Sequence, residues 1–222
     1  MIFASITALS VVLSPLKADA GSALFGTVEF RADHIGSLPQ WTRVMARIGE
    51  EEAVYEACSR DAKACPNRGM MAWQAVINAQ NGGKRLDQVK AINRFVNQWQ
   101  YREDRVNFGR SDHWASPGEF LRRSGDCEDY AITKYVSLRK LGFTPDQLRL
   151  VVLQDVLRDV AHAVLAVYLD GHVYILDNLT NSILPDKRIS HYLPYYSVNE
   201  LSRWAHVKPA GTVVAAHGGD LR

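Results

Sequence analysis

Cys127 stands at the start of an expected helix, in the segment Gly-Asp-Cys-Glu-Asp at 125–129. The first turn of a helix offers free backbone N–H groups and the positive end of the helix dipole, and both stabilise a thiolate. The thiolate is the nucleophilic form of cysteine in covalent catalysis. Most cysteines are small buried residues with no chemical role. Three carboxylates around one thiol make a poor core site, so we predict that Cys127 is a nucleophile.

A base for this thiol is expected on a β-hairpin later in the chain. The Asp-Gly pair after Leu169 is a strong two-residue turn pattern and would pair Leu169 with His172. In that register Asp177 lies opposite Val164, and His162 lies two residues along the same face. His162 and Asp177 are then diagonal neighbours, roughly 7–8 Å apart at the backbone, which suits a side-chain hydrogen bond. His172 points to the other face. A lone strand histidine is usually a core residue, but the pairing with Asp177 favours catalysis.

Cys127, His162 and Asp177 together have the residue types of a nucleophilic triad. The thiolate would attack a carbonyl, His162 would take and return the proton, and Asp177 would hold the imidazole tautomer. The backbone N–H of Cys127 is the expected first donor to the oxyanion. We place the second donor in the region of Trp114.

The carboxylates of Asp126, Glu128 and Asp129 allow two interpretations. Hard oxygen ligands gathered in one turn suit Ca²⁺, which would also offset negative charge that opposes thiolate formation. Ordinary helix-start chemistry explains the same residues, with Asp126 as the cap and two acids favourable to the dipole. A zinc site is not expected, because no second Cys or His lies at ligand spacing from Cys127.

Helices are expected to carry the cysteine and strands to carry its partners. Apolar residues at helical spacing predict helices over 41–57, 70–79 and 86–99, with a loop over 101–114. Ser116 and Pro117 mark a helix start, and a second helix should run over 127–141 and stop at Gly142. The period then changes and predicts strands over 148–153, 161–169 and 172–176, followed by turns and aromatic residues. Helices first and an antiparallel sheet afterwards indicate an α+β fold.

The two ends of the chain differ in composition from the middle. Residues 2–13 form an apolar run followed by Ala-Asp-Ala at 18–20, which is typical of a signal peptide cleaved near Ala20. The run is short for a membrane span, which needs about 20 apolar residues, and no later segment is predicted to be transmembrane. No Lys or Arg precedes the run, so the true start codon is expected upstream. The tail 209–222 is expected to be flexible.

Charge and cysteine content narrow the class of protein further. With 26 basic and 24 acidic residues interspersed, the chain has no basic stripe of the kind that binds nucleic acid. Its three cysteines leave one free thiol if two of them pair in an oxidising compartment. Cys58 and Cys65 are the expected pair, provided that a helix ends between them, as Pro66 suggests. If the helix continued through both cysteines, their seven-residue separation would span about 10.5 Å, which is beyond the reach of a disulfide. The alternative is therefore two reduced cysteines on one continuous helix.

Three segments resemble one known family: Gly-Asp-Cys-Glu-Asp-Tyr-Ala at 125–131, Ala-His-Ala-Val at 161–164 and Leu-Asp-Asn at 176–178. They are similar to the bacterial transglutaminase-like cysteine proteinases, and within them to the LapG group of periplasmic proteases. Trp41 and Trp114 extend the resemblance over most of the chain. It implies a papain/transglutaminase-like domain over 21–208, with a helical lobe at about 38–100 and a catalytic core at about 110–208.

The resemblance also implies a function. It suggests a periplasmic calcium-dependent endopeptidase that cuts the N-terminal region of a large surface adhesin and so disperses biofilm. Asp126 and Glu128 match the acidic positions of the family's calcium site, with Asp129 a third ligand. The implied partner is an inner-membrane cyclic-di-GMP receptor that sequesters the protease. The same triad would also serve acyl transfer from glutamine to an amine or peptidoglycan amide hydrolysis, and a non-catalytic binding module is the alternative of another class.

Overall fold

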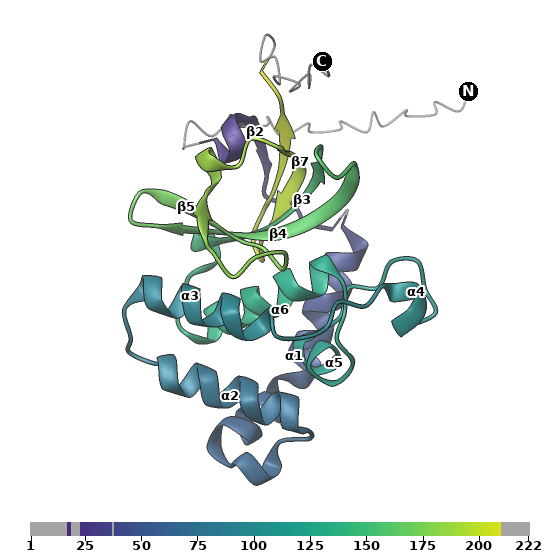
Figure 1. The fold of residues 1–222 in the computed structure, drawn as a ribbon, viewed down its shortest axis with the longest axis vertical. Coiled ribbons are helices and arrows are strands. Elements are labelled where there is room, and N and C mark those ends of the chain that lie inside the picture. The colour runs from purple at the N-terminus through teal and green to yellow at the C-terminus, as the bar shows by residue number, and fades with distance from the viewer. Residues whose placement is uncertain (1–16, 19–22, 37, 210–222) are drawn as a thin grey trace, which may run out of the picture.

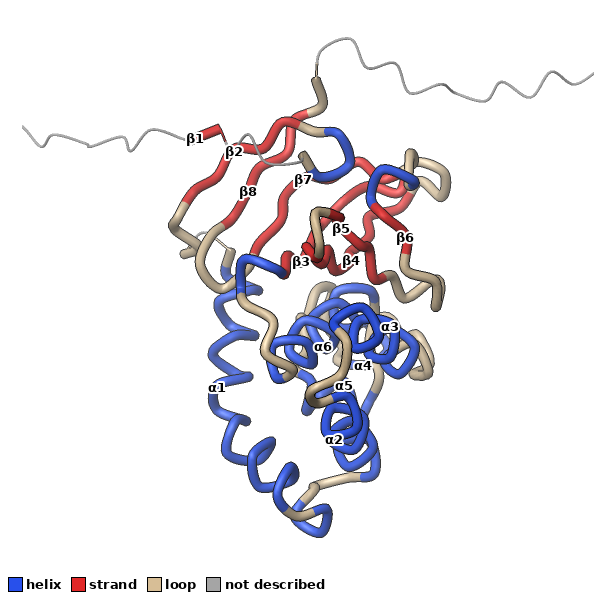
Figure 2. Tube along the Cα trace, turned by 90° about the vertical axis from the view of Figure 1, so that its left-hand side faces the viewer, coloured by secondary structure: helices blue, strands red, loops and turns tan. Residues whose placement is uncertain are grey.

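The computed structural model describes residues 17–18, 23–36 and 38–209. The expected signal peptide and flexible tail therefore lie outside the described residues, except for 17–18 and Pro209. The described chain has two layers, a twisted sheet and a group of helices packed below it in the view of Figure 1. Figure 2, turned by 90°, shows the same separation, with the strands above and the helices below. The predicted α+β fold is confirmed.

In the described part of the chain, six α-helices form the lower layer, and the longest of them begins with a proline in its first turn. Helix α1 buries the stripe of Trp41, Val44 and Ile48 that predicted it, and α6 lies directly beneath strand β4. Near the start of α1, the indole Nε1–H of Trp41 donates to the backbone oxygen of Asn199 at 3.0 Å, which ties this helix to the sheet side. The helices are α1 (Pro39–Arg60), α2 (Arg68–Gln80), α3 (Arg85–Val96), α4 (Asp104–Asn107), α5 (Pro117–Arg123) and α6 (Cys127–Lys140).

The eight strands found among the described residues belong to one antiparallel sheet of order β1-β2-β8-β7-β3-β4-β5-β6. The first of them, β1, falls within the segment expected to be a signal peptide. The strands are β1 (Lys17–Ala18), β2 (Val28–Ala32), β3 (Leu148–Asp155), β4 (Val160–Leu169), β5 (His172–Leu176), β6 (Leu184–Pro185), β7 (Tyr192–Val198) and β8 (Arg203–Val207).

The β4–β5 hairpin has the register predicted from its turn. Leu169 pairs with His172, and Leu165 pairs with Leu176. Both turn residues have positive φ, 50° at Asp170 and 76° at Gly171, as a type I′ turn requires. Asp177 follows the last residue of β5 and lies near His162, as that register predicts.

Both faces of the central sheet are buried, which explains the apolar run over 150–153 in β3. Leu148 and Leu150 join a core that extends through the helices, whereas Val151 and Leu153 join a second core on the opposite face. The helical core includes residues of α1, α2, α3, α5 and α6 as well as of β3, β4 and β5. The helices and one face of the sheet therefore fold around a single interior.

The segments over 101–114 and after residue 178 differ from the sequence-based predictions, and β2 was not predicted. The expected loop over 101–114 contains the short helix α4, and Tyr101 forms a parallel bridge with Gly125. A four-residue helix is too short to show a periodic pattern. The segment after residue 178, where we predicted turns, contributes β6, β7 and β8. Strand β7 was not predicted because it contains Pro194, and proline is disfavoured in a central strand. In the structure, Pro194 pairs with Leu153 at the point where the register between β3 and β7 shifts.

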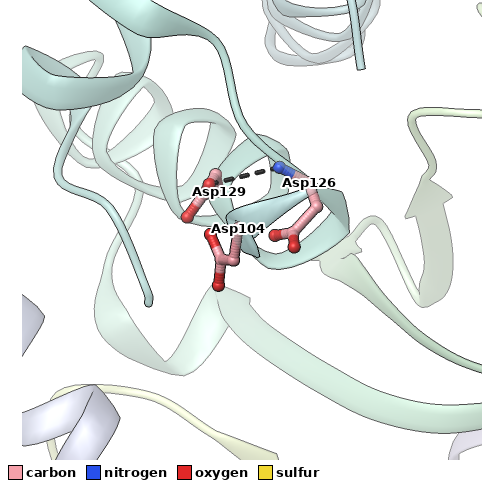
Figure 3. A group of neighbouring side chains, drawn as sticks. All are labelled: Asp104, Asp126 and Asp129. Carbon is pink, nitrogen blue, oxygen red and sulfur yellow. Dashed lines mark hydrogen bonds between the residues drawn. The ribbon is translucent and has the colours of Figure 1, made fainter. Parts of the chain in front are cut away.

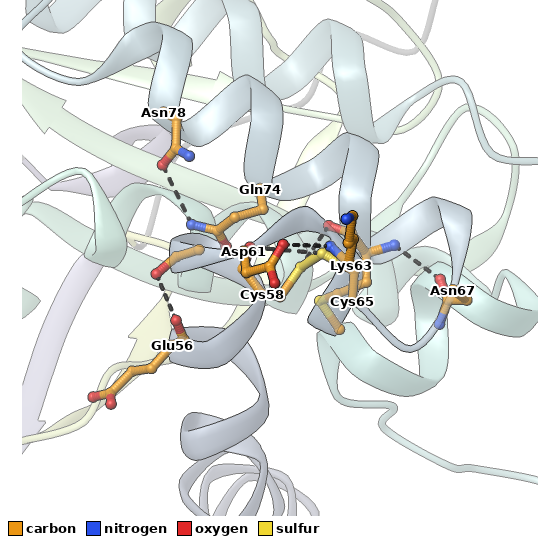
Figure 4. Close-up of a disulfide and its surroundings, with 10 residues drawn as sticks. Glu56, Cys58, Asp61, Lys63, Cys65, Asn67, Gln74 and Asn78 are labelled. Atoms are coloured by element: carbon orange, nitrogen blue, oxygen red, sulfur yellow. Dashed lines mark hydrogen bonds between the residues drawn. A yellow bond between two sulfur atoms is a disulfide. The ribbon is translucent and has the colours of Figure 1, made fainter.

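Cys58 and Cys65 form a disulfide, with their Cα atoms 4.5 Å apart (Figure 4). Helix α1 ends at Arg60, and a 3-10 turn over Ala62–Ala64 brings the second cysteine back. The predicted pair is confirmed, and Cys127 is the free cysteine of the described chain. None of the helices in the described part of the chain has the length and apolar character needed to cross a membrane.

Candidate active site

Cys127 is the first residue of α6, as predicted. The chain enters this helix through a sharp reversal at Ser124, whose φ is +69°. The backbone oxygen of Gly125 accepts a hydrogen bond from the N–H of Arg102 at 2.8 Å, which anchors the segment before the cysteine. Gly125 has no room for a side chain, because a Cβ there would collide with the carboxylate of Asp129. This backbone path fixes where the thiol points.

The sulfur of Cys127 lies between its neighbouring carboxylate and strand β4. Its Sγ is 3.2 Å from Oε2 of Glu128, and the backbone N–H of Ala163 hydrogen-bonds to the sulfur. Burial raises the pKa of Cys127, and the charges of Glu128 and Asp126 raise it further, while the Ala163 N–H lowers it. Ala163 directly follows His162 in β4, so the thiol lies against the strand that carries the predicted base.

His162 and Asp177 are joined by a hydrogen bond of 3.0 Å between Nε2 and Oδ1. Both side chains are buried, at 4% and 7% exposure. Burial would raise the pKa of Asp177, but the hydrogen bond and charge of His162, with hydrogen bonds from Tyr192 and Leu179, outweigh it and hold the pKa below its usual value. An ionised Asp177 accepts the Nε2 proton, which leaves Nδ1 of His162 as the basic nitrogen. The other hairpin histidine, His172, is exposed.

The carboxylates around Cys127 form a larger acidic cluster than the sequence suggested. Asp104, at the start of α4, joins Asp126 and Asp129 in one group (Figure 3), and Asp104, Asp112 and Glu128 form a second. In each group, one oxygen per carboxylate lies within 4.8 Å of the others. Asp104 and Asp112 were missed because they lie in the segment predicted to be a loop, and nothing in their local sequence indicates a partner.

Asp129 is also a structural residue of this cluster. Its Oδ1 accepts the N–H of Ala115 at 2.6 Å, and its Oδ2 accepts the N–H of Asp126 at 3.2 Å. It therefore ties the start of α6 to the segment before α5. The N–H of His113 donates to Asp104. The backbone N–H groups on either side of Trp114 are thus engaged with carboxylates, and the second oxyanion donor expected in this region remains a prediction.

Two observations fit a cation in the cluster. Burial raises the pKa of Asp126 to about 8, with Glu128 as the next cause, and burial raises that of Asp104 to about 6, assisted by the charges of Asp126 and Asp112. Among the described residues, Oδ1 of Asp104 and Oδ1 of Asp126 are buried without a hydrogen-bond partner. Buried carboxylate oxygens that lack donors suit a hard cation such as Ca²⁺.

A family model for the bacterial transglutaminase-like cysteine proteinases matches residues 49–212. The chain belongs to this family. The match covers most of both layers of the fold and includes Cys127, His162 and Asp177.

Solved structures agree with this family assignment. LapG of Legionella pneumophila is 31% identical, covers 68% of this chain and is itself covered to 87%, with a TM-score of 0.61. A calcium-bound form of Legionella LapG is 29% identical, covers 72% of this chain and is itself covered to 93%, with a TM-score of 0.61. An EGTA-treated form is 31% identical, covers 68% of this chain and is itself covered to 84%, with the same TM-score. No curated protein matches the chain. The predicted resemblance to the transglutaminase-like proteinases and their LapG group is therefore confirmed.

Proposed function

We propose that this proteinase is a calcium-dependent cysteine endopeptidase in which Cys127 is the nucleophile, His162 the base and Asp177 the residue that orients the base. One observation carries the proposal. The thiol at the first residue of α6 lies against the backbone of Ala163, and the neighbouring His162 is hydrogen-bonded to a buried carboxylate. Membership of a cysteine peptidase family supports the same reaction class.

The arrangement suits peptide hydrolysis through an acyl-enzyme. Nδ1 of His162 takes the proton of Cys127, and the thiolate attacks the peptide carbonyl. The backbone N–H of Cys127, at the positive end of α6, donates to the developing oxyanion. His162 then protonates the leaving amine, and a water molecule releases the acyl group. Asp177 remains ionised throughout and stabilises the imidazolium.

Asp126 and Glu128 are the proposed calcium ligands closest to the nucleophile, with Asp129 at the helix start and Asp104 and Asp112 across from them. Bound Ca²⁺ would supply positive charge beside carboxylates that oppose the formation of a thiolate. The buried oxygens without donors on Asp104 and Asp126 support this ligand set. A calcium-bound Legionella LapG structure supports the choice of metal.

The similarity to LapG supports a specific biological role. We place the chain in the periplasm after cleavage of a signal peptide near Ala20, with the N-terminal region of a large surface adhesin as its substrate. Cleavage would release the adhesin and end attachment in a biofilm. An inner-membrane receptor for cyclic-di-GMP is the proposed partner that sequesters the protease.

The pairing of thiol and base is tested by alkylation, which needs no substrate. Iodoacetamide should modify wild-type Cys127 quickly at neutral pH in the presence of calcium, and His162→Ala should slow this at least 10-fold, because general-base assistance contributes on the order of 10² or more. The matched control is His172→Ala, on the exposed side of the same hairpin, which should react like wild type. Equal rates for wild type and His162→Ala would rule out the Cys127–His162 pair.

Proteolysis and its metal requirement are tested together in one cleavage assay. The chain from residue 21 and its Cys127→Ala variant are incubated with the N-terminal region of the host's largest repeat-rich surface protein, with calcium or with excess EGTA. We expect a cut only with intact Cys127 and calcium, and an unchanged circular dichroism spectrum in EGTA. Undiminished cleavage in EGTA would exclude the calcium requirement. No cut by a rapidly alkylating protein would point to amine transfer or peptidoglycan hydrolysis instead.

A further inference from the structure

Asp177 is held by more groups than the triad requires. Its Oδ1 accepts two hydrogen bonds, from Nε2 of His162 and from the N–H of Leu179, each at 3.0 Å. Its backbone oxygen accepts the side-chain amide of Asn97 at 2.8 Å. Its second carboxylate oxygen, Oδ2, accepts the hydroxyl of Tyr192 at 2.5 Å. Each carboxylate oxygen therefore has a donor, and the Oδ2 donor comes from a different strand.

Tyr192 is itself firmly placed. It is the first residue of β7, where it pairs with Asp155 of β3, and it is 7% exposed. Its ring lies 5.8 Å from that of Phe25 in an edge-to-face contact and 5.9 Å from the imidazole of His162. Burial raises the pKa of Tyr192, and the bond to Asp177 raises it further, so its hydroxyl keeps the proton it donates. The phenol is thus a fixed donor in contact with two members of the triad.

Asp177 also borders an open space. Asp177 and Tyr192 line one side of a cavity of about 290 Å³, which includes the exposed Leu157 and Leu179. Asp177 follows the end of β5, where strand pairing no longer restrains it. Without a donor on Oδ2, the carboxylate could rotate towards the cavity and its water, and Oδ1 would leave the imidazole.

We propose that Tyr192 is a positioning residue, whose hydroxyl fixes the Asp177 carboxylate and, through it, the ring of His162. This inference rests on the proposed function, because a fixed imidazole matters only if His162 serves Cys127. A fixed orientation keeps Nδ1 directed at the thiol and avoids the cost of reorienting the base during reaction. Tyr192 touches no reacting atom and acts through Asp177.

The test compares two tyrosines of the same strand. Tyr192→Phe removes only the hydroxyl that reaches Asp177. Tyr195→Phe removes a hydroxyl that donates to Gln154 at 2.9 Å on the exposed side, and it is the matched control. With the full chain and calcium, we expect alkylation of Cys127 to fall about 10-fold in Tyr192→Phe, the effect of one hydrogen bond to a charged group, and to stay within twofold in Tyr195→Phe. For a peptide substrate that the enzyme cleaves, kcat of Tyr192→Phe should fall while KM stays unchanged.

The outcomes separate this inference from the proposed function. Wild-type rates in Tyr192→Phe, while His162→Ala is slow, would overturn the positioning role alone. If His162→Ala is as fast as wild type, the proposed function fails and the positioning role fails with it.

A second measurement applies if Tyr192→Phe does not fold. Incorporation of 3-fluorotyrosine at 192 preserves shape and makes the phenol a stronger donor. It should shift the NMR signal of the His162 Nε2 proton, whereas the same label at 195 should not. An unshifted signal would overturn the proposal.

Discussion

Asp104 shows at the scale of single residues how the fold assembles chemistry that local sequence does not reveal. It lies 22 positions before Asp126, yet its carboxylate belongs to both acidic groups beside Cys127. One of its oxygens accepts the N–H of His113, and the other is buried without a donor in the described structure. The first oxygen is structural, and the second is available to a cation.

Asp104→Asn should therefore weaken calcium binding and leave the fold unchanged. The amide oxygen can still accept the His113 N–H, but the charge that a cation needs is lost. We expect the calcium dissociation constant to rise about 10-fold or more, measured by isothermal titration calorimetry on proteins that also carry Cys127→Ala. The control is Asp146→Asn, which changes an exposed aspartate in the 3-10 turn Pro145–Gln147 after α6 and should bind calcium like wild type. An unaltered affinity in Asp104→Asn would remove this residue from the proposed ligand set.

The predicted triad residues were readable because each carries a local pattern. Cys127 follows a helix-start pattern, and the Asp-Gly turn fixes the register that brings His162 near Asp177. Asp104 and Tyr192 carry no such pattern, because their partners are 22 and 15 positions away in other elements. Contacts of this kind depend on how elements pack, and sequence periodicity does not contain that information.

At the scale of elements, α6 contains an unexpected charge. Lys134 is fully buried on this helix, two turns after Cys127, and in the described structure its Nζ has no hydrogen-bond partner. Burial lowers its pKa to about 7, and only the charge of Asp177 acts in the opposite direction. An unfolded lysine titrates near 10.4, so folding loses free energy at neutral pH by placing this group inside.

Lys134→Met should raise the free energy of unfolding at pH 7, by on the order of 3 kcal/mol. The unfolded state binds more protons between pH 7 and about 10.4, so wild-type stability should rise with pH across that window and the variant's should not. Urea unfolding at pH 7 and pH 9 measures both effects. Lys140→Met, which removes a partly exposed ion pair with Glu52 at the end of α6, should change stability by about 1 kcal/mol or less. A Lys134→Met protein less stable than wild type would show that the buried amine is compensated.

At the scale of the whole molecule, buried polar side chains far from Cys127 connect neighbouring strands of the sheet. His206 of β8 is buried between the hydroxyls of Thr27 and Ser197, each 2.9 Å from one ring nitrogen. Burial lowers its pKa to about 4, although Glu29 acts in the opposite direction. These residues connect β8 to β7 and to the segment before β2, on the side of the sheet away from β5.

The buried His206 should make the protein sensitive to mild acid. Its folded pKa is depressed, so its contribution is complete above about pH 6.5 and is lost as the pH falls towards 4. The loss at pH 5 should be about 2 kcal/mol. Urea unfolding at pH 7 and pH 5 should show a smaller decrease for His206→Gln than for wild type, since glutamine does not titrate. Parallel decreases in the two proteins would assign the acid sensitivity to other groups.

The elements that could be predicted are those whose apolar residues recur at helix or strand spacing. The helices α1, α2, α3 and α6 and the strands β3, β4 and β5 lie close to their expected ranges. The strands β2, β6, β7 and β8 were missed, because short strands with proline or charged residues look like irregular chain. The shared interior of helices and sheet was also not visible, since it depends on which face of each element meets another.

The lack of space at Gly125 affects how the activities of substituted variants should be interpreted. In a scan of all single substitutions scored by activity, this position should be as intolerant as the nucleophile two residues later. The reason would be geometric, because any side chain would collide with the Asp129 carboxylate at the start of α6. A ranking by tolerance alone would therefore count among the reactive residues one that has no side chain to react.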